Sequence, residues 1–213
     1  MGDTESGVRT VYPFSCCENR PVSVFCDQTT DGGGWTVFQH REDLLQREDF
    51  FRSWVEYQLG FGNLTGEFWL GLENIHALVS QTLMELRVDL EDFEGEKRWA
   101  KYDFFHIEDS LSKYKLRLGA YEDKGDAGDS LSRQNGQAFS AKDQDNDIDD
   151  KRHCADLFRG GWWYRNCHRS NLNGFQHKGP DTPNSEGINW KEFHGLSYSL
   201  KSTGLSIRPR FTN

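Results

Sequence analysis

The stretch that decides the fold runs from residue 142 to residue 168 and reads KDQDNDIDDKRHCADLFRGGWWYRNCH. Its first half is acidic, with carboxylates at Asp143, Asp145, Asp147, Asp149 and Asp150. Its second half holds Cys154 and Cys167, which enclose the aromatic run Trp162, Trp163 and Tyr164. A disulfide between the two cysteines would stabilise this loop by about 2 to 4 kcal/mol. An acidic loop beside a cysteine-closed loop indicates a metal-braced binding site.

The acidic loop offers oxygen ligands on alternate residues, Asp143, Asp145 and Asp147. Calcium prefers such ligands. The loop is not an EF-hand, because Ile148 stands where that motif needs glycine and Cys154 where it needs glutamate. On spacing alone, a solvated acidic loop remains the alternative to a metal site.

Zinc and catalysis find little support in the sequence. His153 adjoins Cys154 and His168 adjoins Cys167, but adjacent residues seldom both reach one tetrahedral centre. The chain has no nucleophile elbow, no metalloprotease helix motif and no cysteine in a protease-like setting. We therefore expect a binding protein rather than an enzyme. We expect Trp162 to lie in the core, and the choice between core and pocket wall stays open for Trp163.

The composition indicates a globular protein with an aromatic core. The 213 residues are 35% hydrophobic but include 7 Trp, 15 Phe and 7 Tyr, which bury large areas. A net charge of −9 disfavours nucleic acid as a partner. No apolar run reaches the roughly 20 residues of a membrane helix, and the opening MGDTESG lacks a signal-peptide core. The chain is therefore cytosolic or a piece of a secreted protein.

The five cysteines, an odd number, leave at least one without a partner in the chain. Residues 8–12 and 22–25 predict an antiparallel pair with Cys26 at its open end. Cys16 and Cys17 lie in the connecting loop, too far along the strand from Cys26 for a disulfide. We expect a Cys26 partner upstream of Met1. In a secreted chain, Asn63-Leu64-Thr65 is an N-glycosylation acceptor triplet.

Periodicity predicts the remaining elements. Apolar residues recur at helical spacing over 47–59, with Gly60 as the stop, and a second short helix is predicted over 72–79. Strands are predicted over 35–39, 84–91, 113–118 and 205–208. From about residue 119 to residue 195 the periodicity fades, so this half should be built from loops.

A series of long motifs extends over the whole chain. They include DGGGWTVFQH (31–40), EFWLGLENIH (67–76), ELRVDLEDF (85–93), GDAGDSL (125–131), KDQDND (142–147) and GGWWYRNCHRSNLNG (160–174). Together they resemble the fibrinogen C-terminal domain family. The chain is similar to the lectin-like branch, with ficolins and tachylectins, at least as much as to tenascins and angiopoietins.

The resemblance implies an α+β fold in a single domain over residues 1–213. It implies a small N-terminal subdomain (1–38), a central antiparallel sheet flanked by helices (39–118 with 196–213) and a loop-rich calcium-binding C-terminal subdomain (119–195). It also implies a cysteine shortly before this start that pairs with Cys26.

The resemblance also implies a Ca²⁺ site. Its ligands would be the side chains of Asp145 and Asp147 and the backbone carbonyls of Asp149 and Lys151. One extra residue lies between Asp147 and Cys154 relative to the family's usual spacing. The two carbonyls can therefore shift by one position.

The family's acetyl pocket lies beside the second cysteine of the disulfide. There a cis bond, here Asn166-Cys167, would turn the N–H groups of Cys167 and His168 toward an acetyl carbonyl. The wall residues would be Phe158, His168, Asn184 and Ser185. Trp163 is a further candidate for the wall, since its role remains open between core and pocket wall. Related lectins often carry tyrosine at the positions of Phe158 and Asn184. Leu157 and Phe158 also replace the polar residues of the fibrin-type peptide pocket.

The resemblance predicts a secreted, calcium-dependent pattern-recognition lectin of innate immunity. Its partners would be acetylated carbohydrates, such as those with N-acetylglucosamine, on microbial or host surfaces. It would act as a homo-oligomer in the full-length protein, without inserting this segment into a membrane. The alternative is an extracellular protein-binding module of the matrix or growth-factor type.

Overall fold

The computed structural model describes residues 4–14 and 20–210. Its strands are β1 (Gly7–Val11), β2 (Val22–Asp27), β3 (Trp35–Arg41), β4 (Phe61–Gly62), β5 (Phe68–Trp69), β6 (Met84–Glu91), β7 (Lys97–Ile107), β8 (Leu116–Leu118), β9 (Ser170–Asn171), β10 (Asn189–Trp190) and β11 (Ser202–Pro209). Its α-helices are α1 (Trp54–Leu59), α2 (Leu72–Val79), α3 (Cys154–Leu157) and α4 (Lys191–His194). Short 3₁₀ turns span Thr30–Gly32, Ser132–Gln134 and Pro183–Ser185.

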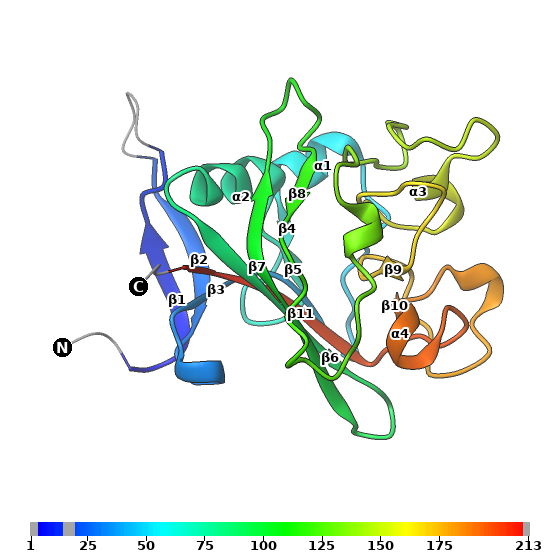
Figure 1. Cartoon of the computed structure of the whole chain (residues 1–213), viewed down its shortest axis with the longest axis horizontal. Coiled ribbons are helices and arrows are strands. Elements are labelled where there is room, and N and C mark those ends of the chain that lie inside the picture. The colour runs from blue at the N-terminus through cyan, green and yellow to red at the C-terminus, as the bar shows by residue number, and fades with distance from the viewer. Residues whose placement is uncertain (1–3, 15–19, 211–213) are drawn as a thin grey trace.

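A 9-stranded sheet forms the centre of the molecule (Figure 1). Its strands follow the order β1-β2-β3-β11-β6-β7-β8, and β5 joins β4 to β3. The last strand of the chain, β11, lies between β3 and β6 and runs antiparallel to both. The sheet is therefore complete only when the C-terminal strand has inserted between two strands that come much earlier in the chain.

The N-terminal hairpin is confirmed as β1 paired antiparallel with β2, and Cys26 lies opposite Gly7 at its open end. Cys16 and Cys17 lie outside the described residues. The sheet crosses the subdomain boundary expected at residue 38, because β3 spans it.

The first helix begins later than predicted. The spacing of apolar residues predicts a helix from Arg47, but α1 begins at Trp54, with Ser53 as its N-cap. Ser53 and Glu56 form a capping box, in which the Ser53 N–H donates to Glu56 Oε2 at 2.8 Å. The aromatic residue Phe50 still reaches the core, although it lies on an extended segment before the cap. Gly60 ends the helix with φ 93°, as expected.

Helix α2 and strands β6 and β11 lie where periodicity predicts them. One strand prediction is corrected, and one strand was missed. β8 begins only at Leu116, because Lys113 and Tyr114 have left-handed φ values of 56° and 49°. The 11-residue strand β7 was not predicted at all.

The expected aromatic core is confirmed. Phe38 stacks on Phe105 with ring centroids 5.3 Å apart and meets Trp69 edge-on at 5.9 Å. Phe139 contacts Trp69 at 5.7 Å and Trp163 at 5.3 Å. These rings continue from the sheet into the loop-rich half, so one core serves both.

The loop-rich half, residues 119–195, has only short regular elements, and most of it lies to the right of the sheet in Figure 1. Buried side chains of β3 fasten it to the sheet. Gln39 Nε2 donates to Leu172 O at 2.9 Å, and Arg41 Nη1 donates to Gly174 O at 2.9 Å. None of the helices in the described residues has the length and apolar character needed to cross a membrane.

Candidate functional site

The predicted disulfide is present and joins α3 to the segment after the aromatic run. Cys154 and Cys167 are bonded, with Cα atoms 5.7 Å apart. The Asn166-Cys167 peptide bond is cis, as the resemblance implied. The N–H of Arg165 donates to Cys167 O at 2.7 Å, which closes a tight turn around the cis bond.

The acidic loop is tied to this disulfide through Asp147. Its Oδ1 accepts a hydrogen bond from the Asp149 N–H at 2.7 Å, and its Oδ2 accepts one from the Cys154 N–H at 2.9 Å. Asp145 Oδ1 in turn accepts from the Asp147 N–H at 3.2 Å. These bonds fix the shape of the loop and place it against the start of α3.

The donor set of Asp145 and Asp147 suits a hard divalent cation. Burial raises the pKa of Asp147 above its usual range, and the neighbouring Asp145 carboxylate adds to the rise. Two carboxylates held together in this way repel each other, and a calcium ion between them would remove that repulsion. The Lys151 carbonyl has no hydrogen bond among the described residues, whereas the Asp149 carbonyl accepts one from the Arg152 N–H at 3.3 Å.

Asp149 has a structural partner of its own. Arg152 Nε donates to Asp149 Oδ2 at 2.7 Å, and this contact lowers the pKa of the carboxyl. Arg152 Nη2 also donates to Asn166 Oδ1 at 3.1 Å, which links the acidic loop to the cis bond. The Asp149 carboxylate lies close to the sulfur atoms of Cys154 and Cys167, but the disulfide leaves neither sulfur as a thiolate for a metal.

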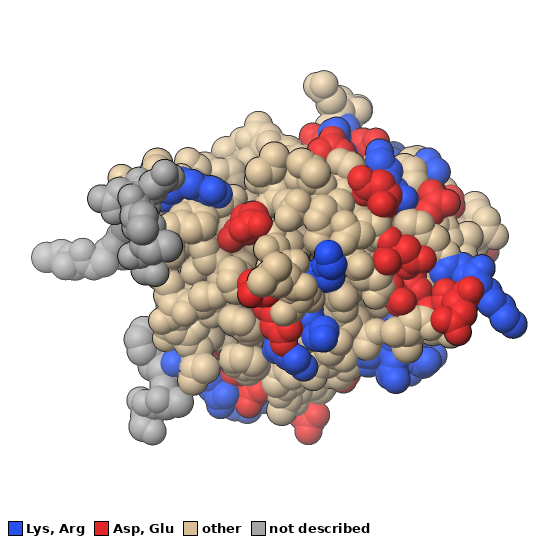
Figure 2. Space-filling model, turned by 90° about the horizontal axis from the view of Figure 1, so that it is seen from above, with Lys and Arg blue, Asp and Glu red and all other residues tan. Residues whose placement is uncertain are grey.

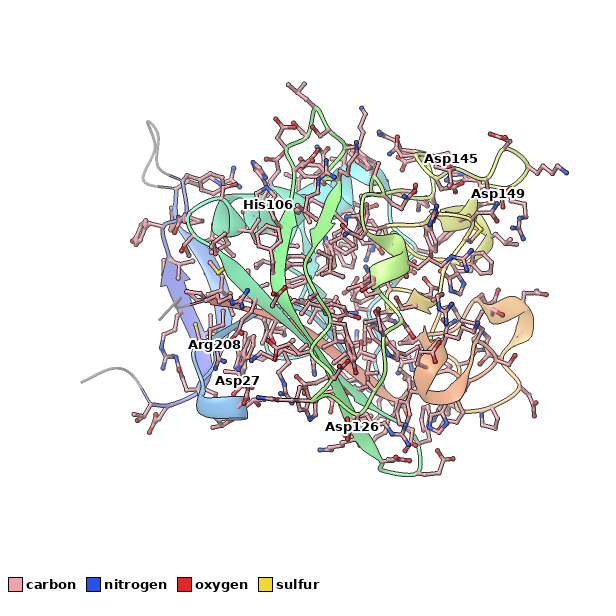
Figure 3. All side chains as sticks on the ribbon, in the orientation of Figure 1. Asp27, His106, Asp126, Asp145, Asp149 and Arg208 are labelled. Carbon is pink, nitrogen blue, oxygen red and sulfur yellow. A yellow bond between two sulfur atoms is a disulfide. The ribbon has the colours of Figure 1, made fainter. Side chains whose placement is uncertain are left out.

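The labelled side chains of Asp145 and Asp149 lie in the same loop at the far end of the loop-rich half, close to the yellow disulfide bond (Figure 3). Figure 2 shows acidic and basic side chains gathered together over this end of the molecule.

A second group of possible metal ligands, Asp92, Glu96 and His194, converges between the β6–β7 turn and α4. His194 Nε2 is already hydrogen-bonded to Asp92 Oδ2 at 2.8 Å. This contact holds α4 against the turn, and we assign the group a structural role.

An aromatic pair lies beside the disulfide. The ring of Phe158 meets the His168 ring edge-on, with centroids 4.4 Å apart, and Tyr164 lies 6.0 Å from the same imidazole. His168 Nδ1 is buried without a hydrogen-bond partner among the described residues. Burial lowers the pKa of His168 to about 4, so the ring is neutral at physiological pH.

The backbone next to this pair carries two unused donors. Within residues 4–14 and 20–210, neither the Cys167 N–H nor the His168 N–H donates a hydrogen bond. Consecutive unpaired N–H groups beside an apolar ring pair suit a small ligand with a carbonyl oxygen and a methyl group.

Asn171 organises the wall and was not found from the sequence. Its Nδ2 donates to the carbonyls of Phe158 (3.0 Å), Gly187 (3.2 Å) and Glu186 (3.3 Å), and its Oδ1 accepts from the Tyr164 hydroxyl at 2.6 Å. The buried amide thus brings α3 and the segment after Ser185 together. Its place in the motif SNLNG was the only signal, and that motif does not show that its asparagines are buried or what they contact.

Asn184 and Ser185 lie in the 3₁₀ turn Pro183–Ser185. Both have left-handed backbones, with φ values of 51° and 59°. Asn184 is exposed, and the Ser185 carbonyl accepts from Asn189 Nδ2 at 2.9 Å. The contacts of Asn171 with the residues after them bring this turn to the Phe158 side of the site.

Trp163 does not belong to the wall. It is 1% exposed, packs on Phe105 and Phe139, and donates from Nε1 to Tyr114 O at 2.9 Å. A ring enclosed by the core has no surface with which to contact a ligand, so of the two roles left open for Trp163 the structure supports core packing. Asn63 lies outside this site, on an exposed turn between β4 and β5.

Comparison with known proteins gives consistent matches. A family model described as fibrinogen beta and gamma chains, C-terminal globular domain, matches residues 1–210. Mouse tenascin-R is 48% identical over 208 residues, which are 98% of this chain and 15% of tenascin-R. Ryncolin-4 of Cerberus rynchops is 47% identical over 98% of this chain and 59% of its own length. The chain therefore spans only part of either relative.

Solved structures with the same fold belong to the same group of proteins. The fibrinogen-like globe domain of human ANGPTL2 superposes with a TM-score of 0.92 at 45% identity, covering 98% of this chain and 94% of that domain. A lamprey fibrin D-dimer complexed with the peptide ligand Gly-His-Arg-Pro-amide superposes at 0.88 and 35% identity, covering 100% of this chain and 72% of the other.

Proposed function

This chain belongs to the family of fibrinogen C-terminal globular domains, and from that premise we propose that it is an extracellular, calcium-dependent lectin for acetylated glycans. It acts as a binding module rather than an enzyme. The ligand is an N-acetyl group, which inserts beside the Cys154–Cys167 disulfide.

The single observation that carries this proposal is the pair of unpaired N–H groups at Cys167 and His168. They adjoin the apolar edge formed by Phe158 and the neutral imidazole of His168. An acetyl carbonyl would accept from these donors, and the methyl group would pack against the rings. A neutral His168 supports this arrangement, because a charged ring would not receive a methyl group.

Calcium would act as a brace. When bound, it supplies positive charge between the carboxylates of Asp145 and Asp147. The Lys151 carbonyl is a further candidate ligand. The Asp149 carbonyl could also serve once it no longer accepts the hydrogen bond from the Arg152 N–H. Asp147 contacts the Cys154 N–H, and Cys154 begins the helix that leads to Phe158. Ordering the acidic loop would therefore stabilise the pocket without the ion touching the sugar.

Two substitutions relative to related lectins shape the expected affinity. Phe158 and Asn184 bring no hydroxyl groups to the wall, so binding should rest on the backbone donors and on apolar contact. A shallow site of this kind binds weakly on its own. Homo-oligomerisation of a longer protein would then supply avidity.

Retention on an N-acetylglucosamine resin tests the proposal. We expect retention in the presence of calcium and elution by free acetate or by a chelator. The variant Asp147→Asn should lose retention. Asp150→Asn is the matched control, because Asp150 is an exposed acid of the same loop. No retention of the calcium-loaded wild type would refute the lectin.

A protein-binding module of the matrix or growth-factor type is the second candidate. Ile148 in the acidic loop is 53% exposed and Leu157 in α3 is 40% exposed, which gives this end of the molecule apolar surface suited to a protein partner. A glycan array separates the two functions. If the calcium-loaded domain binds none of the acetylated sugars on the array, the result would favour a protein partner.

A further inference from the structure

A groove on the sheet lies away from the site described above. Its volume is about 500 Å³, within the range of small-ligand pockets, and it is lined by residues of β2, β3, β11, β6 and β7. Asp27, one of its lining residues, and Asp149 of the acidic loop lie at opposite ends of the molecule in Figure 3. The groove is therefore not part of the acetyl site.

The floor of the groove consists of small residues on β11, namely Ser202, Gly204 and Ser206. A Cβ added at Gly204 would meet nothing within 4 Å, and its φ lies outside the left-handed range. Neither packing nor backbone conformation therefore requires glycine here. A glycine inside a central strand weakens a sheet, and it commonly marks a place where another group approaches the backbone closely.

The walls are amphipathic. Phe25, Leu64 and Trp99 line the groove as partly buried apolar side chains. Arg87 lies over the Trp99 ring at 4.7 Å and donates from Nε to both oxygens of Asp89 at 2.9 Å. Aromatic faces beside fixed polar groups suit a carbohydrate, which has apolar ring faces and hydroxyl edges.

The acceptor triplet Asn63-Leu64-Thr65 forms one rim. Leu64 and Thr65 line the groove, and Asn63 is exposed next to them. Asn63 Oδ1 accepts from the Thr65 N–H at 3.0 Å and from the Thr65 hydroxyl at 2.9 Å. Asn63 Nδ2 donates no hydrogen bond within the described residues, so this nitrogen is available for attachment of a sugar.

We propose that Asn63 carries an N-linked glycan whose first sugars lie in this groove against Trp99 and over Gly204. The sugars come from a lipid-diphosphate-linked oligosaccharide. Asn63 Nδ2 displaces the diphosphate at C1, so that a C–N bond forms, the C–O bond breaks, and the Nδ2 proton is lost to a base. The docked glycan would cover the otherwise open face of β11. This inference is independent of the acetyl site.

Enzymatic deglycosylation of the native protein tests the proposal. For this test the chain would be expressed as a secreted protein in a eukaryotic host that glycosylates. The intact mass before and after amidase treatment of the denatured protein reports the occupancy of Asn63. Asn63→Gln is the negative control. We expect the amidase to release the glycan from native wild type about tenfold more slowly than from native Gly204→Leu. This ratio corresponds to a free energy of about 1.4 kcal/mol for docking of the glycan in the groove. A Cβ at Gly204 would meet nothing within 4 Å, so the backbone accepts a side chain here, and leucine is chosen to fill the groove.

Thr10→Leu is the matched control, because Thr10 is an exposed strand residue that does not line the groove. It should release its glycan as slowly as wild type. Removal of the glycan should lower the melting temperature of wild type and of Thr10→Leu but not that of Gly204→Leu. An unmodified Asn63, or equal release rates in all three proteins, would overturn the proposal.

Discussion

His168 places a neutral imidazole where solvent does not reach its Nδ1. Its ring contacts are with Phe158 and Tyr164, and burial is the cause of its lowered pKa. A buried group that must stay neutral links folding to pH, because the unfolded chain binds a proton more readily.

The folded pKa of His168 is about 4, below the ordinary histidine pKa of 6.5. The stability associated with the neutral ring is therefore complete above pH 6.5 and is lost as the pH falls toward 4. In His168→Phe this loss is absent. The free energy of unfolding of wild type should fall by about 2 kcal/mol more than that of His168→Phe between pH 7 and pH 5. Urea titrations at both pH values measure this, and a constant difference would contradict it.

Residue roles were predictable only where a motif carried them. Cys154, Cys167 and the cis bond before Cys167 follow from the family motif, and the structure contains both features. The role of Trp163 stayed open and Asn171 was not identified, because whether an aromatic or an amide faces the interior depends on partners far along the chain. Trp163 donates a hydrogen bond to the Tyr114 carbonyl, and Asn171 donates to the carbonyls of Glu186 and Gly187.

At the scale of elements, helix α1 shows how a cap overrides periodicity. Apolar spacing from Arg47 onward resembles a helix, but the Ser53 and Glu56 pair sets the start seven residues later, at Trp54. Hydrogen bonds from Ser53 lower the pKa of Glu56 to about 2, so its carboxylate is charged at neutral pH.

Ser53→Ala removes one side of the capping box and should lower the free energy of unfolding by about 1 kcal/mol at neutral pH. Chemical denaturation followed by circular dichroism measures the change. Val55→Ala in the same helix is the control, because Val55 is 56% exposed and should change stability by less than about 0.5 kcal/mol. Equal losses in the two variants would refute the role of the cap.

Strand β7 escaped prediction for a reason seen in its pairing with β6. Met84 lies opposite Phe105 and Leu86 opposite Tyr102, so β7 holds one extra residue between these pairs. Such a bulge breaks the alternation of apolar and polar residues that reveals a strand in a sequence. β6 keeps its alternation and was predicted.

At the scale of the whole molecule, the arginine of one buried ion pair also joins the sheet to the loop-rich half. Arg41 Nε donates to Glu67 Oε1 at 3.0 Å, with both side chains at most 2% exposed. Arg41 also donates to Gly174 O, and Glu67 accepts from the Glu48 N–H at 2.8 Å. Each charge therefore depends on the other and on the loops around it.

Arg41→Met leaves the Glu67 carboxylate buried without its cation and should cost about 3 to 5 kcal/mol of unfolding free energy. The double variant Arg41→Met/Glu67→Gln should cost less than the sum of the single variants. Arg117→Met is the control, since the Arg117–Glu108 pair is exposed and should contribute at most about 1 kcal/mol. Additive losses in the cycle would show that the two residues act separately.

The family, the β1–β2 hairpin, helix α2, strands β6 and β11, and the disulfide were all predictable from the sequence, since each depends on local periodicity or on a contiguous motif. Three features became visible only in the folded chain: β11 lies between β3 and β6, Asn171 joins α3 to the turn at Ser185, and the Asn63 turn borders a groove over Gly204. These features depend on contacts between residues distant in the chain, and a linear pattern does not contain such contacts.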